Sequence, residues 1–318
     1  MKATVLGCGR WGSFVAWYLD LIKFDVTIWG RDGSANLNSL IKTRKNNFLT
    51  LNDNINISSD LDSVVSDCDI IFISIASQSL RSLVKTLKQL PINSNIPIVL
   101  CMKGIETKTG KRLSQIVSEF LDNPVAIWVG PGHVQDFVNG VPNCMVIDSE
   151  NEELKYNLVN QLSSNLIRFY IGRDLLGNEI GAAAKNVIGI ASGMLDALGY
   201  ESLKGALMSR GTREVARLID AMGGQAISVY GLSHLGDYQA TLFSKHSNNR
   251  LFGETYVNKT VCDKLAEGFY TAEALVFLSK KYNIELPISC AVYDIITKSL
   301  DPKEVLSTLF MRSIKMEF

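Results

Sequence analysis

The sequence lacks the features that mark several large classes of protein. It has three histidines and six cysteines, and no two cysteines form a C-x-x-C pair, so we expect neither a metal site nor a dense disulfide framework. No apolar run approaches the roughly 18 to 20 residues that a membrane-spanning helix needs. Gly7, Gly9 and Gly12 interrupt the apolar N-terminal run that a signal peptide would require. We therefore expect a cytoplasmic protein with reduced thiols and no membrane insertion.

A net charge of one sign is also missing. The chain has 32 basic and 32 acidic residues, so it has no overall field that would recruit nucleic acid or an anionic membrane surface. We expect no nucleic-acid partner, and an anionic ligand would have to be bound by local groups. The hydrophobic fraction of 47% is typical of globular proteins, and 318 residues are enough for two domains.

Short β-branched runs alternate with amphipathic stretches in the first half of the chain. The predicted strands are Ala3–Leu6, Asp25–Trp29, Asp69–Ile75, Ile96–Cys101, Val125–Val129, Cys144–Ile147 and Ile167–Ile171. Helical periodicity separates most of them, as in Trp11–Ile22, Leu80–Leu90 and Gly110–Leu121. This alternation predicts an α/β domain with a mostly parallel, doubly wound sheet of the Rossmann type.

The pattern changes after Gly172. Strand-like runs nearly vanish, and long helical patterns follow at Leu175–Leu198, Gly205–Met222 and Lys264–Tyr282. We therefore predict two domains, an NAD(P)-binding domain over residues 1–172 and an all-helical substrate domain over residues 173–318.

A glycine motif joins the first predicted strand to the first predicted helix. In this context Gly7 permits a tight turn, Gly9 lets the backbone approach a pyrophosphate, and Gly12 permits close helix packing, while the helix N-terminus offers N–H donors to the anion. The alternative is a glycine turn without a ligand. The predicted cofactor-binding residues here are Gly7, Gly9, Arg10, Trp11 and Gly12.

The end of the second predicted strand bears on the choice between NAD and NADP. An acidic residue there binds the ribose 2′-hydroxyl, whereas an arginine accommodates a 2′-phosphate. The sequence Trp29-Gly30-Arg31-Asp32 offers both signals, and Arg31 could equally be a solvated turn residue. We predict NAD(P)H as the cofactor, and the sequence slightly favours NADP.

Lys185 has unusually small neighbours on its predicted helix. The residues three and four positions away include Gly181, Ala182 and Gly189, which are too small to cover the lysine side chain. A ligand or another chain segment can therefore approach it, and proton transfer is one use of such an amine. The alternative is a lysine between the domains that is paired with an acid.

Four sets of motifs together resemble the bacterial type of NAD(P)-dependent glycerol-3-phosphate dehydrogenase. They lie at residues 7–12 (GCGRWG), 101–106 (CMKGIE) and 130–133 (GPGH), and in the series 179–188, 209–211 and 231–237. The resemblance implies a C-terminal domain similar to that of 6-phosphogluconate dehydrogenase, and a homodimer. It also implies hydride transfer between NAD(P)H and dihydroxyacetone phosphate, giving glycerol 3-phosphate for glycerophospholipid synthesis.

The same resemblance implies roles for particular residues. Lys185 would exchange a proton with the substrate oxygen, Asp237 would orient it, and Lys103 would polarise or position the substrate. Cofactor contacts would also come from Lys103, Val134, Asn248 and Glu267. Substrate contacts would come from Lys103, Gly130, Gly132, Lys185, Asp237, Ser247, Asn248 and Asn249.

The sequence departs from the family pattern at two places. Asn248 stands where the family's Ser-Arg-Asn-Arg has an arginine for the substrate phosphate, and an amide there forfeits a charge-assisted hydrogen bond worth about 1.5 to 3 kcal/mol. Gly132 replaces a small hydroxyl residue, and Lys245 or Arg250 could compensate.

These departures leave two alternatives to the leading reading. One is a related dehydrogenase with another substrate, and the other is a non-catalytic NAD(P)-binding regulatory protein, against which the retention of Lys185 and Asp237 argues. Of the histidines, His133 is expected in a loop near the site. His234 and His246 are expected to be structural or solvent-facing.

Overall fold

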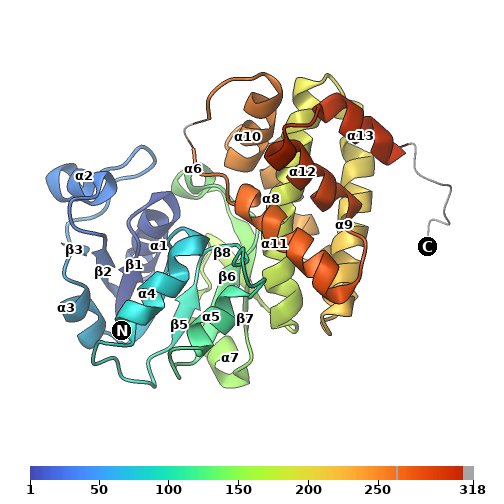
Figure 1. The fold of residues 1–318 in the computed structure, drawn as a ribbon. Coiled ribbons are helices and arrows are strands. Elements are labelled where there is room, and N and C mark those ends of the chain that lie inside the picture. Colours follow the sequence, from blue (N-terminus) through green and yellow to red (C-terminus); the bar gives the residue numbers. More distant parts are fainter. Residues whose placement is uncertain (263, 311–318) are drawn as a thin grey trace. The chain divides into compact units, whose positions relative to one another are not determined.

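The computed structural model describes residues 1–262 and 264–310, which form two compact units (Figure 1). The sheet unit contains residues 1–103 and 111–179, and the helical unit contains residues 104–110 and the chain from Ile180 onward. The border expected from the sequence follows Gly172, whereas the residues from there to Glu179 group with the sheet.

The sheet unit is built on one eight-stranded sheet in the order β3-β2-β1-β4-β5-β6-β7-β8. Its strands are β1 (Lys2–Leu6), β2 (Asp25–Trp29), β3 (Asn56–Ser58), β4 (Ile70–Ile73), β5 (Ile98–Leu100), β6 (Val125–Val129), β7 (Asn143–Ser149) and β8 (Ile167–Ile171). The sequence predicted all of them except β3, an edge strand of three residues whose Asn and Ser flank a single apolar side chain. This is the doubly wound order, in which β1 has β2 on one side and β4 on the other.

Every pair of neighbouring strands is parallel except β6 and β7, so the prediction of a mostly parallel sheet is confirmed. The connection between β6 and β7 contains only the five-residue helix α6 (Val134–Val138). At about 1.5 Å per residue such a helix is too short to carry the chain back along the sheet. β7 therefore starts at the carboxyl end of β6 and runs the opposite way.

Helices cover the sheet, as the spacing of the apolar residues predicts. They are α1 (Arg10–Leu21), α2 (Ala35–Thr43), α3 (Leu61–Ser66), α4 (Leu80–Leu87), α5 (Leu113–Ser118), α6 and α7 (Glu152–Leu162). Phe14 of α1, Phe137 of α6 and Leu158 of α7 share one buried core with Trp128 of β6. The sequence analysis did not single out α2, α3, α6 and α7, which are short or weakly apolar.

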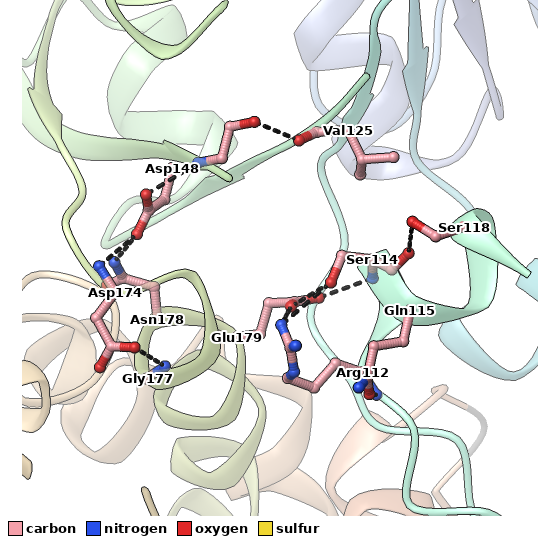
Figure 2. A network of polar contacts seen from close by, with 11 residues as sticks. Arg112, Ser114, Gln115, Ser118, Val125, Asp148, Asp174, Gly177, Asn178 and Glu179 are labelled. Atoms are coloured by element: carbon pink, nitrogen blue, oxygen red, sulfur yellow. Dashed lines mark hydrogen bonds and ion pairs between the residues drawn. The ribbon is translucent and has the colours of Figure 1, made fainter. Parts of the chain in front are cut away.

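Two buried carboxylates attach the start of α8 (Leu175–Ala197) to the sheet unit (Figure 2). Asp148 of β7 accepts hydrogen bonds from the Asp174 amide at 3.1 Å and the Asn178 side chain at 2.7 Å. Glu179 accepts one from Arg112 at 2.6 Å and two from Ser114, which opens α5. These contacts explain why the first turn of α8 belongs with the sheet.

The helical unit surrounds the rest of α8, which is buried along most of its length. The other helices are α9 (Lys204–Ala221), α10 (Asn248–Val257), α11 (Glu267–Tyr282), α12 (Pro287–Lys298) and α13 (Pro302–Phe310). A Cβ on Gly193 would lie 1.9 Å from the Arg250 carbonyl oxygen, and one on Gly268 would lie 2.7 Å from the Asn186 carbonyl oxygen. These glycines let α10 and α11 approach the α8 backbone closely.

Three kinds of feature are missing from the described residues. The six cysteines are all free. No group of three or more His, Cys, Asp or Glu side chains in residues 1–262 and 264–310 could hold a metal ion. Over the same residues, no helix combines the length and the apolar character needed to cross a bilayer.

Candidate active site

The glycine motif forms a close turn at the point where β1 lies between β2 and β4. Gly7 has a φ of +119°, a conformation that side-chain-bearing residues rarely adopt, and a Cβ there would lie 2.1 Å from the Ser74 carbonyl oxygen at the end of β4. Gly12 is equally constrained, because its Cβ would lie 1.8 Å from the Gly7 carbonyl oxygen. Only glycine fits these two positions.

Gly9 differs, since a Cβ on it would meet nothing within 4 Å. Gly9 precedes α1, and no side chain in the described part of the chain caps that helix; its first turn also has no acidic residue. The exposed amides and the positive end of the helix dipole therefore face an open space beside bare backbone. These residues fit the pyrophosphate of a dinucleotide, because bulk is excluded where the turn packs and absent where a ligand would lie.

Arg10 adds a positive charge to this turn. Its guanidinium donates to the Gln135 side chain of α6 at 2.9 Å and lies 4.7 Å from the centre of the Phe48 ring. Burial lowers the pKa of Arg10 from its usual value, which leaves it charged at neutral pH. Trp11 packs against the ring of Phe137, and Val134, also expected at the cofactor, is buried at the start of α6. The structure thus brings these predicted cofactor residues around one helix terminus.

Arg31 and Asp32 are both exposed beyond the end of β2. The Asp32 carboxylate accepts the amide of the next residue, Gly33, at 3.0 Å, so this acid is engaged in its own turn. The Arg31 carbonyl accepts the Ser34 amide, and Ser34 in turn caps α2. The backbone of Arg31 is therefore held while its guanidinium extends from the surface.

Lys103 follows β5 and donates a hydrogen bond to the carbonyl oxygen of Gly130 at 2.7 Å. Gly130 and Gly132 have φ values of +136° and +146°, so both favour glycine. A Cβ on Gly132 would also lie 2.3 Å from the Phe137 ring. The hydroxyl residue that the family pattern has at this position would not fit beside that ring without rearrangement of the turn.

The helical unit contains a buried cluster of three side chains, which we call the lysine cluster: Lys185, Asp237 and Thr241. The Lys185 amine lies 2.9 Å from Asp237 Oδ2 and donates to Thr241 Oγ1 at 2.5 Å. The side chains of Lys185 and Asp237 are only 8% and 2% exposed. An amine so held by two oxygens can be aimed at a ligand and can exchange a proton with it.

Thr241 belongs to a π-helical turn, η5 (Gln239–Phe243), that follows Asp237. Such turns are rare, because their wider spacing is less favourable than that of the α-helix. Here the Leu242 carbonyl accepts hydrogen bonds from Ser192 Oγ at 2.9 Å and from the buried Lys204 amine at 3.1 Å. These contacts hold the turn that places Thr241 beside Lys185.

The two halves of the chain match two models of one family. The model described as NAD-dependent glycerol-3-phosphate dehydrogenase N-terminus matches residues 2–155, and the model of the C-terminus of the same enzyme matches residues 174–307. The chain belongs to the NAD-dependent glycerol-3-phosphate dehydrogenase family.

Curated relatives of this glycerol-3-phosphate dehydrogenase family match over the full chain. Glycerol-3-phosphate dehydrogenase [NAD(P)+] of Fusobacterium nucleatum is 35% identical, over 100% of this chain and 98% of its own. The enzyme of the same name from Clostridium botulinum is 33% identical, over 99% of both chains. The crystal structure of glycerol-3-phosphate dehydrogenase from Coxiella burnetii superposes with a TM-score of 0.91 at 26% identity, covering 98% of this chain and 99% of that one.

The residues expected at the substrate phosphate of a glycerol-3-phosphate dehydrogenase lie at the start of α10. Ser247 caps the helix by accepting the Arg250 amide, and Asn248 donates to the Leu265 carbonyl oxygen at 3.3 Å. Arg250 is bound to Asp196 at 2.7 Å and lies near Glu254, so it is engaged within the unit. Lys245, the other residue considered as compensation for Asn248, is exposed.

Asn249 links α8 to α11. It donates to the Asn186 side chain at 3.0 Å and accepts the Gly268 amide at 2.9 Å. Gly268 follows Glu267, the half-buried first residue of α11 that the resemblance places at the cofactor. The structure therefore brings Asn249 and Glu267 to the same end of α11 in this family member.

Sequence reasoning missed three partners of the predicted residues. Thr241 and Asn186 lie beside Lys185 or its neighbour, and Gln135 accepts from Arg10. Thr241 follows Asp237 by four positions and Asn186 follows Lys185 directly, so proximity along the chain was the available signal. Gln135 had none, since it is far from Arg10 in sequence.

Proposed function

We propose that this chain reduces dihydroxyacetone phosphate to glycerol 3-phosphate with NAD(P)H, and so supplies glycerophospholipid synthesis. The observation that carries the proposal is the buried lysine cluster in the C-terminal unit of a chain whose N-terminal unit has a dinucleotide cradle. A protein that only sensed nucleotides would have no use for a buried amine held by a carboxylate and a hydroxyl.

Lys185 is the proposed proton donor to the carbonyl oxygen of the substrate. Asp237 and Thr241 orient its amine, and both lie within hydrogen-bonding distance of it. Lys103 polarises or positions the substrate oxygen. When bound, NAD(P)H supplies the hydride, so the protein contributes position, charge and a proton. In the reverse direction, Lys185 accepts the proton from the C2 hydroxyl group.

The substrate is proposed to contact the glycine turn at Gly130 and Gly132, and the start of α10 at Ser247, Asn248 and Asn249. Asn248 offers a neutral donor to a phosphate. Arg250 already binds Asp196, and therefore we assign it no phosphate contact. Binding of the phosphate is accordingly expected to be weaker than an arginine at position 248 would give.

NADP is the proposed preferred cofactor. The support is the pair of residues after β2, where the Asp32 carboxylate already accepts an amide and Arg31 is exposed. An arginine at this place can form two parallel hydrogen bonds to a 2′-phosphate. The remaining proposed cofactor contacts are Gly7, Gly9, Arg10, Trp11, Gly12, Lys103, Val134, Asn248 and Glu267.

The roles of Lys185 and the cofactor are tested by steady-state oxidation of NADPH and NADH with dihydroxyacetone phosphate. We expect turnover with both cofactors and a higher kcat/KM with NADPH. Lys185→Ala should abolish turnover and leave cofactor binding intact, as measured by fluorescence titration. Absence of turnover by the wild-type protein with either cofactor would remove the proposed reaction.

Three further proposals rest on the family alone. A border between the NAD(P)-binding domain, residues 1–172, and the substrate domain is tested by limited proteolysis. A homodimer is tested by light scattering coupled to size-exclusion chromatography. A cytoplasmic location is tested by fractionation of the source cells.

A further inference from the structure

His234 lies three residues before Asp237 and is fully buried. Its Nδ1 is 2.8 Å from the Gly181 carbonyl oxygen of α8, and its Nε2 is 2.8 Å from the Tyr238 hydroxyl. A carbonyl oxygen only accepts hydrogen bonds, so Nδ1 carries the hydrogen and Nε2 accepts from Tyr238. These two contacts specify one neutral tautomer of the imidazole.

The backbone groups on either side of this imidazole belong to the two charged residues of the lysine cluster. Gly181 precedes Lys185 by one helical turn, so its carbonyl also accepts the Lys185 amide within α8. The His234 carbonyl accepts the Asp237 amide at 3.0 Å. A single side chain therefore connects the backbone that carries the lysine to the backbone that carries the aspartate.

Two glycines make room for this arrangement. A Cβ on Gly181 would lie 3.0 Å from the His234 Cβ, and one on Gly211 of α9 would lie 3.3 Å from the Tyr238 hydroxyl oxygen. The two rings meet edge to face with centroids 4.8 Å apart, and Tyr238 is also fully buried. α8 and α9 are thus both shaped to hold the pair in one geometry.

Burial keeps the imidazole neutral. It lowers the pKa of His234 to about 4, and the opposite charges of Lys185 and Asp237 act on it in opposite directions. At neutral pH the ring therefore has no charge to exchange, and its contribution is geometric.

We propose that His234, held in one tautomer by Tyr238, is a positioning residue that fixes Asp237 in register with Lys185. It has no direct contact with the reacting atoms. The role rests on the proposed function, since it deepens the account of the same acid/base pair. The competing explanation is a buried pair that only stabilises the helical unit.

Three variants and a matched control separate these explanations. His234→Ala removes both contacts, His234→Asn keeps a donor where Nδ1 lies, and Tyr238→Phe removes only the acceptor's partner. Tyr18→Phe is the control, because Tyr18 is a buried phenol in the sheet unit that donates to the Leu162 carbonyl oxygen at 2.5 Å. All four should lower the melting temperature.

Only the loss of positioning should change turnover. We expect His234→Ala to lower kcat about 10-fold to 100-fold with an unchanged KM, because small misplacements of catalytic groups have effects of that size. His234→Asn should recover most of the loss, Tyr238→Phe should show a smaller loss, and Tyr18→Phe should keep the wild-type kcat. If the alanine variant does not fold, Tyr238→Phe and His234→Asn still give the comparison.

A second readout does not depend on turnover. In protein labelled with ¹⁵N-lysine, the Lys185 Nζ resonance should move in His234→Ala toward its position in Asp237→Asn, and return in His234→Asn. An inactive wild-type protein would overturn the proposed reaction, while this resonance would still report the positioning. Folded His234→Ala protein with the wild-type kcat and an unmoved resonance would overturn the role of His234.

Discussion

Removing one member of the Lys185–Asp237 ion pair should destabilise the protein more than removing both. The perturbation consists of Asp237→Asn, Lys185→Met and the double variant. Both side chains are less than a tenth exposed, and the atoms that pair are 2.9 Å apart. Each single variant therefore leaves a charge in a place from which water is largely excluded.

The magnitude follows from this burial. Removal of one partner of a buried ion pair destabilises a protein by about 3 to 5 kcal/mol. The asparagine variant should fall near 3 kcal/mol, because the new amide oxygen and Thr241 Oγ1, 2.5 Å from the amine, still accept hydrogen bonds. Replacement of both charges is often close to neutral, so the double variant should recover about 2 kcal/mol or more relative to the sum of the single variants.

Urea unfolding gives the free energy of unfolding for each variant, and steady-state assays give kcat for the folded protein. Stability and activity should separate, since the double variant regains stability without regaining turnover. Loss of the proton donor alone should reduce kcat by at least about 100-fold.

Asp148→Asn is the matched control for this experiment. Asp148 is a buried carboxylate of the sheet unit that lies 3.6 Å from the buried Lys155 amine, and it has no proposed role at the substrate. Its loss should lower the free energy of unfolding and leave kcat unchanged. Strictly additive losses in the double variant, or wild-type turnover without Lys185, would refute the reasoning.

Four further outcomes are expected. Gly12→Ala should raise the Kd for NADPH by at least about 10-fold in fluorescence titrations, because its Cβ would lie 1.8 Å from the Gly7 carbonyl oxygen; an unchanged Kd would contradict the cradle. Arg31→Ser should raise the KM for NADPH about 10-fold or more and spare NADH, and equal effects on both cofactors would count against a 2′-phosphate contact. Asn248→Arg should lower the KM for dihydroxyacetone phosphate about 10-fold, whereas no gain would indicate that the residue does not face the phosphate. Because the pKa of His234 is lowered to about 4, the unfolded chain binds its proton first as pH falls. The contribution of His234 to stability is therefore complete above about pH 6.5 and is lost toward pH 4, so urea unfolding of His234→Asn should depend less on pH over that range than wild type does.

Local patterns predicted the sheet well because each strand except β3 carries its own apolar signal. The β4 sequence is apolar at every position and is buried at every position, as a central parallel strand must be. The glycine motif was equally legible, since Gly7 and Gly12 are needed for contacts within the turn itself and with the strand beside it. α10 and α12 were harder, because short helices whose faces are defined by other helices have weak periodicity of their own.

The amino-acid sequence by itself determined the α/β class, the dinucleotide cradle and the identity of Lys185 and Asp237 as a candidate pair, because these depend on periodicity and on motifs of adjacent residues. Only the tertiary structure showed the contact of that pair with Thr241, the neutral tautomer of His234 and the engagement of Arg250 by Asp196. Each of these depends on side chains that are distant along the chain and meet only after α8 has packed against its neighbours. A linear pattern specifies which residues are available for chemistry, whereas burial and distance decide which of them act together.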